Sequence, residues 1–324
     1  MAACTDSLSS GRRPVDPGST SGPWVGLDLN RQPFDAICRT LSVPGSRKDG
    51  TASADGGGIV SGTTPAVEQV RSADGTPIAF ERSGTGPAII LVGGALSDRN
   101  TTRDIGAALA PDFTVFSYDR RGRGYSGDTA PYEIGREIDD LAALIAAAGA
   151  SAAVYGISSG AVLAALATAQ GLPVTGLVLF EPPFQVGPHV GVWKDTTAQL
   201  IELIAADDRD GAVETFLSTS VGLPAEMITE MKAQPVWSSL TAIAHTLPYD
   251  EIVTAGGRMP TDRLAAITAP TLAVDSTGSP QWLRDASRAA AEAVPGGRSI
   301  SLDGGYHEVP PTTLAPALRE FLLA

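Results

Sequence analysis

The sequence predicts an α/β protein with a mostly parallel central sheet flanked by helices, and three observations support this fold class. From about Val67 onward, apolar runs of strand length alternate with longer stretches of helical periodicity, as in parallel strands joined by helical crossovers. The alternation is interrupted once, at about 185–261, where helical patterns follow one another with no strand between them. The 324 residues are 43% hydrophobic and 18% charged, which is enough to build a large buried core.

The predicted strands are short apolar runs, each bounded by Gly, Pro or polar residues. They cover 77–81, 88–92, 113–118, 152–157, 176–181, 271–275 and 298–302. The clearest helices have apolar residues at helical spacing and fall between the strands. They cover 133–148, 159–169, 282–293 and 314–323. In the interrupted stretch, the helical patterns cover 196–206, 210–218, 225–232 and 236–247.

The chain divides into an N-terminal extension at 1–66 and a folded domain at 67–324. The extension is rich in Gly, Ser, Pro, Asp and Thr, a composition typical of disordered segments. The domain carries the helical stretch at about 185–261 between two strands. This position favours a cap over the sheet edge at which open α/β sheets bind ligands. A separate helical domain is the alternative.

Composition limits the partners of this protein. The net charge of −13 repels phosphate backbones and anionic membranes, and no apolar run approaches the roughly 18 residues of a membrane span. The two cysteines, Cys4 and Cys38, have neither metal-binding nor redox spacing. We therefore expect a small-molecule substrate, no nucleic acid, no membrane, no metal or other cofactor, and a reducing compartment, the cytoplasm.

The segment Gly156-Ile157-Ser158-Ser159-Gly160 follows a predicted strand and opens a predicted helix. A G-x-S-x-G pattern in this context is typical of a nucleophile elbow, a sharp turn that lifts the serine hydroxyl out of the sheet. Small residues must flank such a turn, and two glycines do so here. The pattern predicts Ser158 as a nucleophile and the backbone N–H of Ser159 as a donor to an oxyanion.

A serine nucleophile needs a base, and the chain has three histidines. His307 comes directly after the last predicted strand and ahead of the C-terminal helix, so we assign it as the base. His189 and His245 fall in the helical stretch, where we expect them to be polar residues of the cap, although either could touch substrate. Gly93-Gly94 follows an early buried strand, and the tight turn there predicts the N–H of Ala95 as the second oxyanion donor.

These features together resemble the α/β-hydrolase family over roughly 67–324. The segment 118–126, YDRRGRGYS, is similar to the family's D-x-R-G-x-G-x-S loop, and Gly305-Tyr306-His307 is similar to its terminal G-x-H. The resemblance implies a mostly structural role for Asp119 and Arg120. Segments 180–184, FEPPF, and 245–250, HTLPYD, resemble a group of actinobacterial α/β-hydrolases of undefined substrate.

The third member of the catalytic triad departs from that family pattern. The family's P-T-L-x-x-x-G-x-x-D-P corresponds to 270–280, where Ser279 stands in place of the acid. Asp275 lies four residues earlier and would need an altered loop. Glu181 ends the strand after the elbow helix, where some family members, including certain haloalkane dehalogenases, carry their acid. We favour Glu181; Asp275 and a Ser–His dyad are the alternatives.

Serine at the elbow argues against dehalogenase or epoxide hydrolase chemistry, which needs a carboxylate nucleophile, and favours acyl transfer to water. We therefore predict a serine hydrolase that forms an acyl-enzyme from an ester, lactone or thioester. Five large apolar residues of the cap favour an apolar or aromatic acyl group, unless they form the core of the cap. These are Trp193, Phe216, Met227, Met231 and Trp237. The alternatives are a non-hydrolytic cyclase, lyase or perhydrolase on the same scaffold, or a catalytically dead binding protein.

Overall fold

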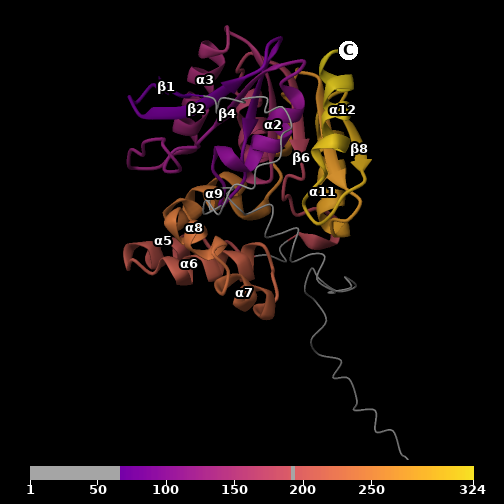
Figure 1. The fold of residues 1–324 in the computed structure, drawn as a ribbon. Coiled ribbons are helices and arrows are strands. Elements are labelled where there is room, and N and C mark those ends of the chain that lie inside the picture. The colour runs from indigo at the N-terminus through magenta and orange to yellow at the C-terminus, as the bar shows by residue number, and fades with distance from the viewer. Residues whose placement is uncertain (1–65, 191–193) are drawn as a thin grey trace, which may run out of the picture.

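The computed structural model describes residues 66–190 and 194–324, which it builds around a sheet of eight strands (Figure 1). Their order across the sheet is β1-β2-β4-β3-β5-β6-β7-β8. β2 is antiparallel to both β1 and β4, and every other neighbouring pair is parallel. The strands are β1 Val67–Arg71, β2 Pro77–Ser83, β3 Ala88–Val92, β4 Thr114–Tyr118, β5 Ala152–Ile157, β6 Val174–Phe180, β7 Thr271–Ser276 and β8 Arg298–Leu302.

The central strands are nearly continuous apolar runs because helices cover both faces of the sheet. In β3, the residues from Ile89 to Val92 are fully buried. One face packs against α3, α4 and α11, and the other packs against α2 and α12. The bounds of these helices are α2 Arg103–Leu109, α3 Ile134–Ala147, α4 Ser159–Ala169, α11 Gln281–Ala293 and α12 Pro311–Leu322. The predicted fold class is therefore confirmed.

All the elements between β6 and β7 are helical in the described part of the chain. They are the 3-10 turn Gly187–His189, α5 Thr197–Ala205, α6 Arg209–Thr215, the π-helical turn Phe216–Ser220, α7 Ala225–Lys232, α8 Val236–Ala242, the 3-10 turn Ala244–Thr246, α9 Leu247–Thr254, the 3-10 turn Ala255–Gly257 and α10 Thr261–Leu264. Residues of α5 to α9 and of the turns between them contribute to a third core cluster, whereas Leu264 of α10 packs into the core of the sheet domain. Figure 1 shows α5 to α8 gathered to one side of the sheet.

Several elements carry too weak a pattern to be predicted. β1 is an edge strand whose residues alternate between exposed and half-buried, so it lacks an apolar run. α2 is only seven residues long and is stabilised by packing against α12 and the sheet. The predicted helix at 236–247 is wrong in its extent, because α8 ends at Ala242 and α9 begins at Leu247.

The extension predicted at 1–66, apart from its last residue, lies outside the described residues, and so do Cys4, Cys38 and Trp193. Among the described residues, no helix is both long and apolar enough to cross a membrane. The same residues contain no cluster of His, Cys, Asp or Glu that could hold a metal ion.

Candidate active site

Ser158 lies on the sharp turn between β5 and α4. Its backbone has φ 57° and ψ −127°, a conformation that residues with a side chain rarely adopt. Residues held in such conformations cluster at functional sites. The two flanking glycines are required by close packing. A Cβ on Gly156 would lie 2.4 Å from the carbonyl oxygen of Gly160, and one on Gly160 would lie 2.5 Å from that of Gly93. The local sequence therefore permits a turn that presents the Ser158 side chain to the cavity described below.

His307 follows β8 and also has a left-handed backbone, with φ 52°. Its Nδ1 lies 2.5 Å from Oε2 of Glu181, and its backbone N–H donates to Oγ of Ser279 at 2.9 Å. With Nδ1 engaged by a carboxylate, Nε2 is the ring nitrogen left for proton transfer. His307 and Ser158 line the same cavity.

Glu181 stands at the end of β6, fully buried, with φ 46°. Its second oxygen, Oε1, accepts the backbone N–H of Ser276 at 2.8 Å. The carboxylate is thus held from one side by the end of β7 while its other oxygen meets the His307 ring. Ser158, Glu181 and His307 are all non-glycine residues with positive φ, which points to a strained, functionally constrained group.

The structure does not bring Asp275 to His307. Its Oδ1 accepts from Nε of Arg284 at 3.0 Å, and its Oδ2 accepts from Oγ of Ser301 at 3.0 Å. Both carboxylate oxygens are therefore engaged within the β7, β8 and α11 corner. Ser279, at the position where the resemblance places an acid, binds the backbone of His307 rather than its ring.

The turn after β3 lies directly against the elbow. A Cβ on Gly94 would lie 3.1 Å from Cβ of Ser158, so the Gly94–Ala95 peptide borders the nucleophile. Ala95 and Ser159 both line the cavity. Ser159 is the first residue of α4, and the amide at such a position has no partner inside its own helix. The two predicted oxyanion donors therefore lie on elements that border Ser158.

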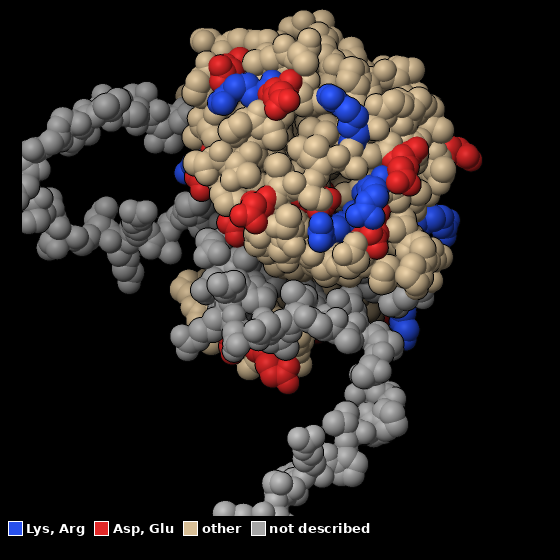
Figure 2. All heavy atoms as spheres, turned by 90° about the vertical axis from the view of Figure 1, so that its right-hand side faces the viewer, with Lys and Arg blue, Asp and Glu red and all other residues tan. Residues whose placement is uncertain are grey.

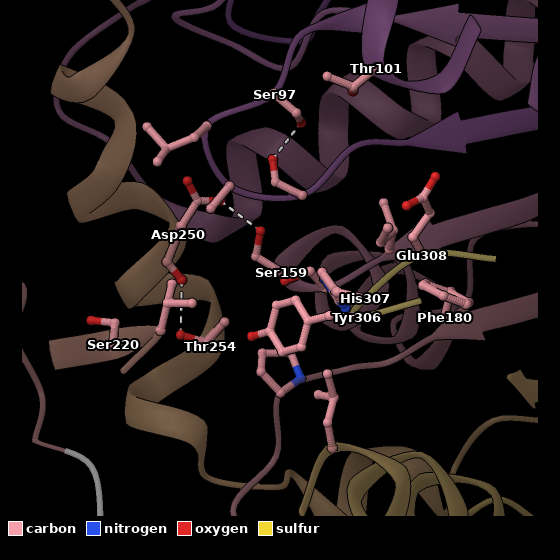
Figure 3. A pocket seen from close by; sticks show the side chains of 18 of the residues that line it. Ser97, Thr101, Ser159, Phe180, Ser220, Asp250, Thr254, Tyr306, His307 and Glu308 are labelled. Carbon is pink, nitrogen blue, oxygen red and sulfur yellow. Dashed lines mark hydrogen bonds between the residues drawn. The ribbon is translucent and has the colours of Figure 1, made fainter. Parts of the chain in front are cut away.

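A cavity of about 480 Å³ contains this group of residues, a size suited to a small organic ligand. Figure 3 shows Ser159, Asp250, Tyr306 and His307 around it. The apolar lining comes from the sheet domain and from the helical segment between β6 and β7. It includes Leu96, Ile105, Ile157, Phe180, Phe216, Leu217, Val221, Leu223, Trp282, Leu283, Val309 and Leu314.

The large apolar residues of the predicted cap that the structure describes divide between the cavity and the core of the helical segment. Phe216 lines the cavity, whereas Met227, Met231 and Trp237 pack into the core of the helical segment. For these three residues the structure favours the alternative that they form the core of the helical segment. His189 and His245 do not line the cavity either.

Sequence reasoning missed the charged residues that surround the turn after β3. Asp250 of α9 lines the cavity, is buried, and accepts from Arg120, Arg123 and Ser159. The segment HTLPYD, which ends in Asp250, was the available signal, but nothing in the sequence paired it with the arginines of the 118–126 loop. Within that loop Asp119 is buried and accepts from Nη1 of Arg99 at 2.7 Å.

Burial controls the acid–base behaviour around the cavity. It raises the pKa of Glu251, although Ser220 and Thr196 donate to that carboxylate. Burial together with the Glu181 carboxylate raises the pKa values of Tyr155 and Tyr306, so both phenols stay neutral. Tyr306 thus offers the cavity an aromatic ring and an uncharged hydroxyl.

Comparison with known proteins agrees with this architecture. The sequence profile of the Alpha/beta hydrolase family matches residues 88–317. The crystal structure of an alpha/beta hydrolase from Sphaerobacter thermophilus is 48% identical, covers 78% of this chain and 99% of its own, and superimposes with a TM-score of 0.75. An esterase from a Rhodococcus species is 21% identical, covers 80% of this chain and 98% of its own, and has a TM-score of 0.59. An enol-lactonase from Burkholderia xenovorans is 21% identical, covers 79% and 100%, and has a TM-score of 0.58; these last two show likeness of fold.

Proposed function

Because this chain belongs to the alpha/beta hydrolase family, we propose that it is a serine hydrolase that cleaves an ester, lactone or thioester through an acyl-enzyme. The observation that carries the proposal is the grouping of Ser158 and His307 on one cavity, with Glu181 at 2.5 Å from the His307 ring. The order Ser, acid, His along the chain is the order of α/β-hydrolase triads.

Each residue has a role in two half-reactions. His307 Nε2 takes the Ser158 proton as Oγ attacks the substrate carbonyl carbon, and the N–H groups of Ala95 and Ser159 bind the resulting oxyanion. His307 then protonates the departing alcohol or thiol, which leaves Ser158 acylated. Water, deprotonated by His307, then attacks the acyl carbon; the bond from that carbon to Ser158 Oγ breaks, His307 returns the proton to Oγ, and the carboxylic acid is released. Throughout, Glu181 holds the His307 ring and stabilises its protonated form.

The cavity supports a small, apolar or aromatic acyl group. Its walls are mostly aliphatic and aromatic, and its charged lining includes Asp104, Asp250, Glu251 and Glu308 against Lys194. The excess of acidic over basic side chains in this lining disfavours anionic substrates. The helical segment acts in this proposal as a cap, because Phe216, Leu217, Val221 and Leu223 come from it and line the cavity.

Surface charge and cysteine content support a small-molecule substrate and a reducing compartment. On the face shown in Figure 2, basic and acidic side chains are interspersed rather than gathered into one basic surface. This distribution and the net charge of −13 disfavour nucleic acid as a partner. With two cysteines in 324 residues, we propose the cytoplasm as its location.

A catalytically dead binding protein is the competing function suggested by Ser279 at the usual position of the acid. The Glu181–His307 pair removes that reason, because a carboxylate from another strand meets the imidazole. The test is a screen of aryl esters, lactones and acyl thioesters with Ser158→Ala as the blank, together with labelling by a fluorophosphonate. We expect hydrolysis and labelling that both disappear in Ser158→Ala. A wild-type chain that neither turns over these substrates nor reacts with the probe would contradict the proposal.

A further inference from the structure

We propose that Asp250 is a positioning residue that fixes both backbone donors of the oxyanion hole, an inference that rests on the proposed function. Asp250 lies on α9, in the helical segment between β6 and β7, whereas the two donors belong to the sheet domain. A residue of the helical segment would therefore contribute to stabilising the transition state, although both oxyanion donors lie in the sheet domain.

The carboxylate of Asp250 is buried and engaged at both oxygens. Its Oδ1 accepts from Oγ of Ser159 at 2.8 Å and from Nη1 of Arg120 at 2.7 Å. Its Oδ2 accepts from Nη2 of Arg123 at 2.7 Å. Figure 3 shows the contact between Asp250 and Ser159 at the cavity. Hydrogen bonds between charged partners are shorter and stronger than those between neutral ones, so this carboxylate is held firmly.

Through Arg123, Asp250 reaches the first donor. Nη1 of Arg123 donates to the carbonyl oxygen of Gly94 at 2.5 Å, and Oγ of Ser97 donates to the same oxygen at 2.6 Å. That carbonyl belongs to the same peptide unit as the N–H of Ala95. The peptide is planar, and in its trans form the C=O and N–H point in opposite directions. Fixing the Gly94 carbonyl therefore fixes the direction of the Ala95 N–H, and a cationic donor on the carbonyl also polarises that N–H.

Through Ser159, Asp250 reaches the second donor. The Ser159 hydroxyl donates to Asp250 and accepts from Nη1 of Arg120 at 3.2 Å. The side chain of Ser159, the first residue of α4, is thereby anchored from outside the helix. α9, which carries Asp250, also packs against α4, which begins with Ser159. The position of Asp250 relative to the Ser159 N–H is therefore fixed by helix packing as well as by the hydrogen bond.

The charges of the network balance. Arg120 also makes a bidentate pair with Glu137, at 2.7 and 3.1 Å, which gives two guanidiniums and two carboxylates. Burial alone would raise the pKa of Asp250, but Arg123 and Arg120 bring it below its ordinary value. Asp250 is therefore ionised at neutral pH. Without Asp250, the buried Arg123 guanidinium would lose its carboxylate partner, and a buried charge left unpaired is strongly destabilising.

The test compares Asp250→Asn with Asp140→Asn. Asp140 is the matched control, since it is equally buried, binds Arg121 at 2.7 and 2.8 Å, and does not line the cavity. In Asp250→Asn we expect kcat to fall by about 10- to 100-fold with KM little changed, because removal of a single oxyanion donor costs about 10²- to 10³-fold. The inhibition constant of an arylboronic acid, which forms a tetrahedral adduct with Ser158, should rise by the same factor. Asp140→Asn should lower the Tm and leave both quantities unchanged.

Arg123→Lys is the second variant, because it keeps the charge balance if Asp250→Asn fails to fold. One ammonium cannot reproduce the guanidinium fork that joins Gly94 to Asp250, so we expect the same selective loss of kcat and of boronic acid affinity. An unchanged kcat in folded Asp250→Asn or Arg123→Lys would overturn the inference, and so would an equal loss in Asp140→Asn. If the wild type lacks hydrolase activity that depends on Ser158, the proposed function fails and this inference falls with it. An active wild type with unaffected Asp250 and Arg123 variants rejects this inference alone.

Discussion

Oε2 of Glu181 lies 2.5 Å from Nδ1 of His307, although 126 residues separate them along the chain. The fold achieves this contact by ending β6 and β8 on either side of β7. The Ser276 N–H at the end of β7 then holds the other oxygen of Glu181. The carboxylate that meets His307 is therefore attached to the end of a strand rather than to the loop that contains Ser279.

Replacing Glu181, the proposed acid, should remove most of the proposed activity without unfolding the protein. We expect Glu181→Gln to lower kcat by about 10⁴-fold, because a neutral amide cannot stabilise the imidazolium of His307. Asp275→Asn is the control, since Asp275 binds Arg284 and Ser301 instead, and its kcat should stay within about threefold of wild type. Steady-state kinetics on the best ester from the screen, with circular dichroism of each variant, measures both. The reverse ranking would identify Asp275 as the acid.

The Ser279 hydroxyl should matter through the backbone of His307. In Ser279→Ala the His307 N–H loses its acceptor, and a buried unsatisfied donor costs about 1–3 kcal/mol. We expect a lower Tm and a loss of kcat of about tenfold or less, since the Glu181 contact remains. Thermal unfolding and kcat, measured side by side with Glu181→Gln, separate the two roles. A loss in Ser279→Ala as large as that in Glu181→Gln would mean that the hydroxyl participates in proton transfer.

Gly160 should not tolerate a methyl group. A Cβ there would lie 2.5 Å from the carbonyl oxygens of both Gly93 and Val92, so Gly160→Ala must push the β3 turn away from the elbow. We expect a loss of about 1–3 kcal/mol in unfolding free energy together with reduced kcat. Gly135→Ala is the control, because that exposed position in α3 has open space around its Cβ. It should gain up to about 1 kcal/mol from better helix propensity. Urea unfolding tests the pair, and equal stability of the two variants would refute the close approach.

His245 should make stability depend on pH. Burial lowers its pKa below the ordinary 6.5, with help from Arg209 and Arg123 and against Asp128, and its Nδ1 has no hydrogen-bond partner in the described part of the chain. The unfolded chain therefore binds a proton at a higher pH than the folded chain does. The contribution of His245 to the free energy of unfolding is therefore present in full above about pH 6.5. It is lost as the pH falls toward the pKa that His245 has in the folded chain. Urea midpoints at pH 5 to 8 should show this slope in wild type and a flatter one in His245→Gln, and equal slopes would contradict it.

The sequence by itself determined the fold and two members of the candidate triad. Strand and helix periods predict the sheet because they are local, and the seven predicted strands are present with shifts of a few residues. Ser158 and His307 could be predicted because each occupies a short motif at a strand end. β1 and α2 could not be predicted, because their sequences carry too weak a periodic pattern. Packing against β2 and α12 stabilises them instead.

Only the tertiary structure decided which carboxylate meets His307 and which charged residues surround the turn after β3. Glu181 and Asp275 both end parallel strands, so strand order and side-chain direction, which depend on contacts distant in sequence, separate them. Asp250 is 127 residues from Arg123, and no local pattern encodes that contact. Local periodicity specifies each element, whereas a buried charge is satisfied only by partners that the completed fold brings within hydrogen-bond distance.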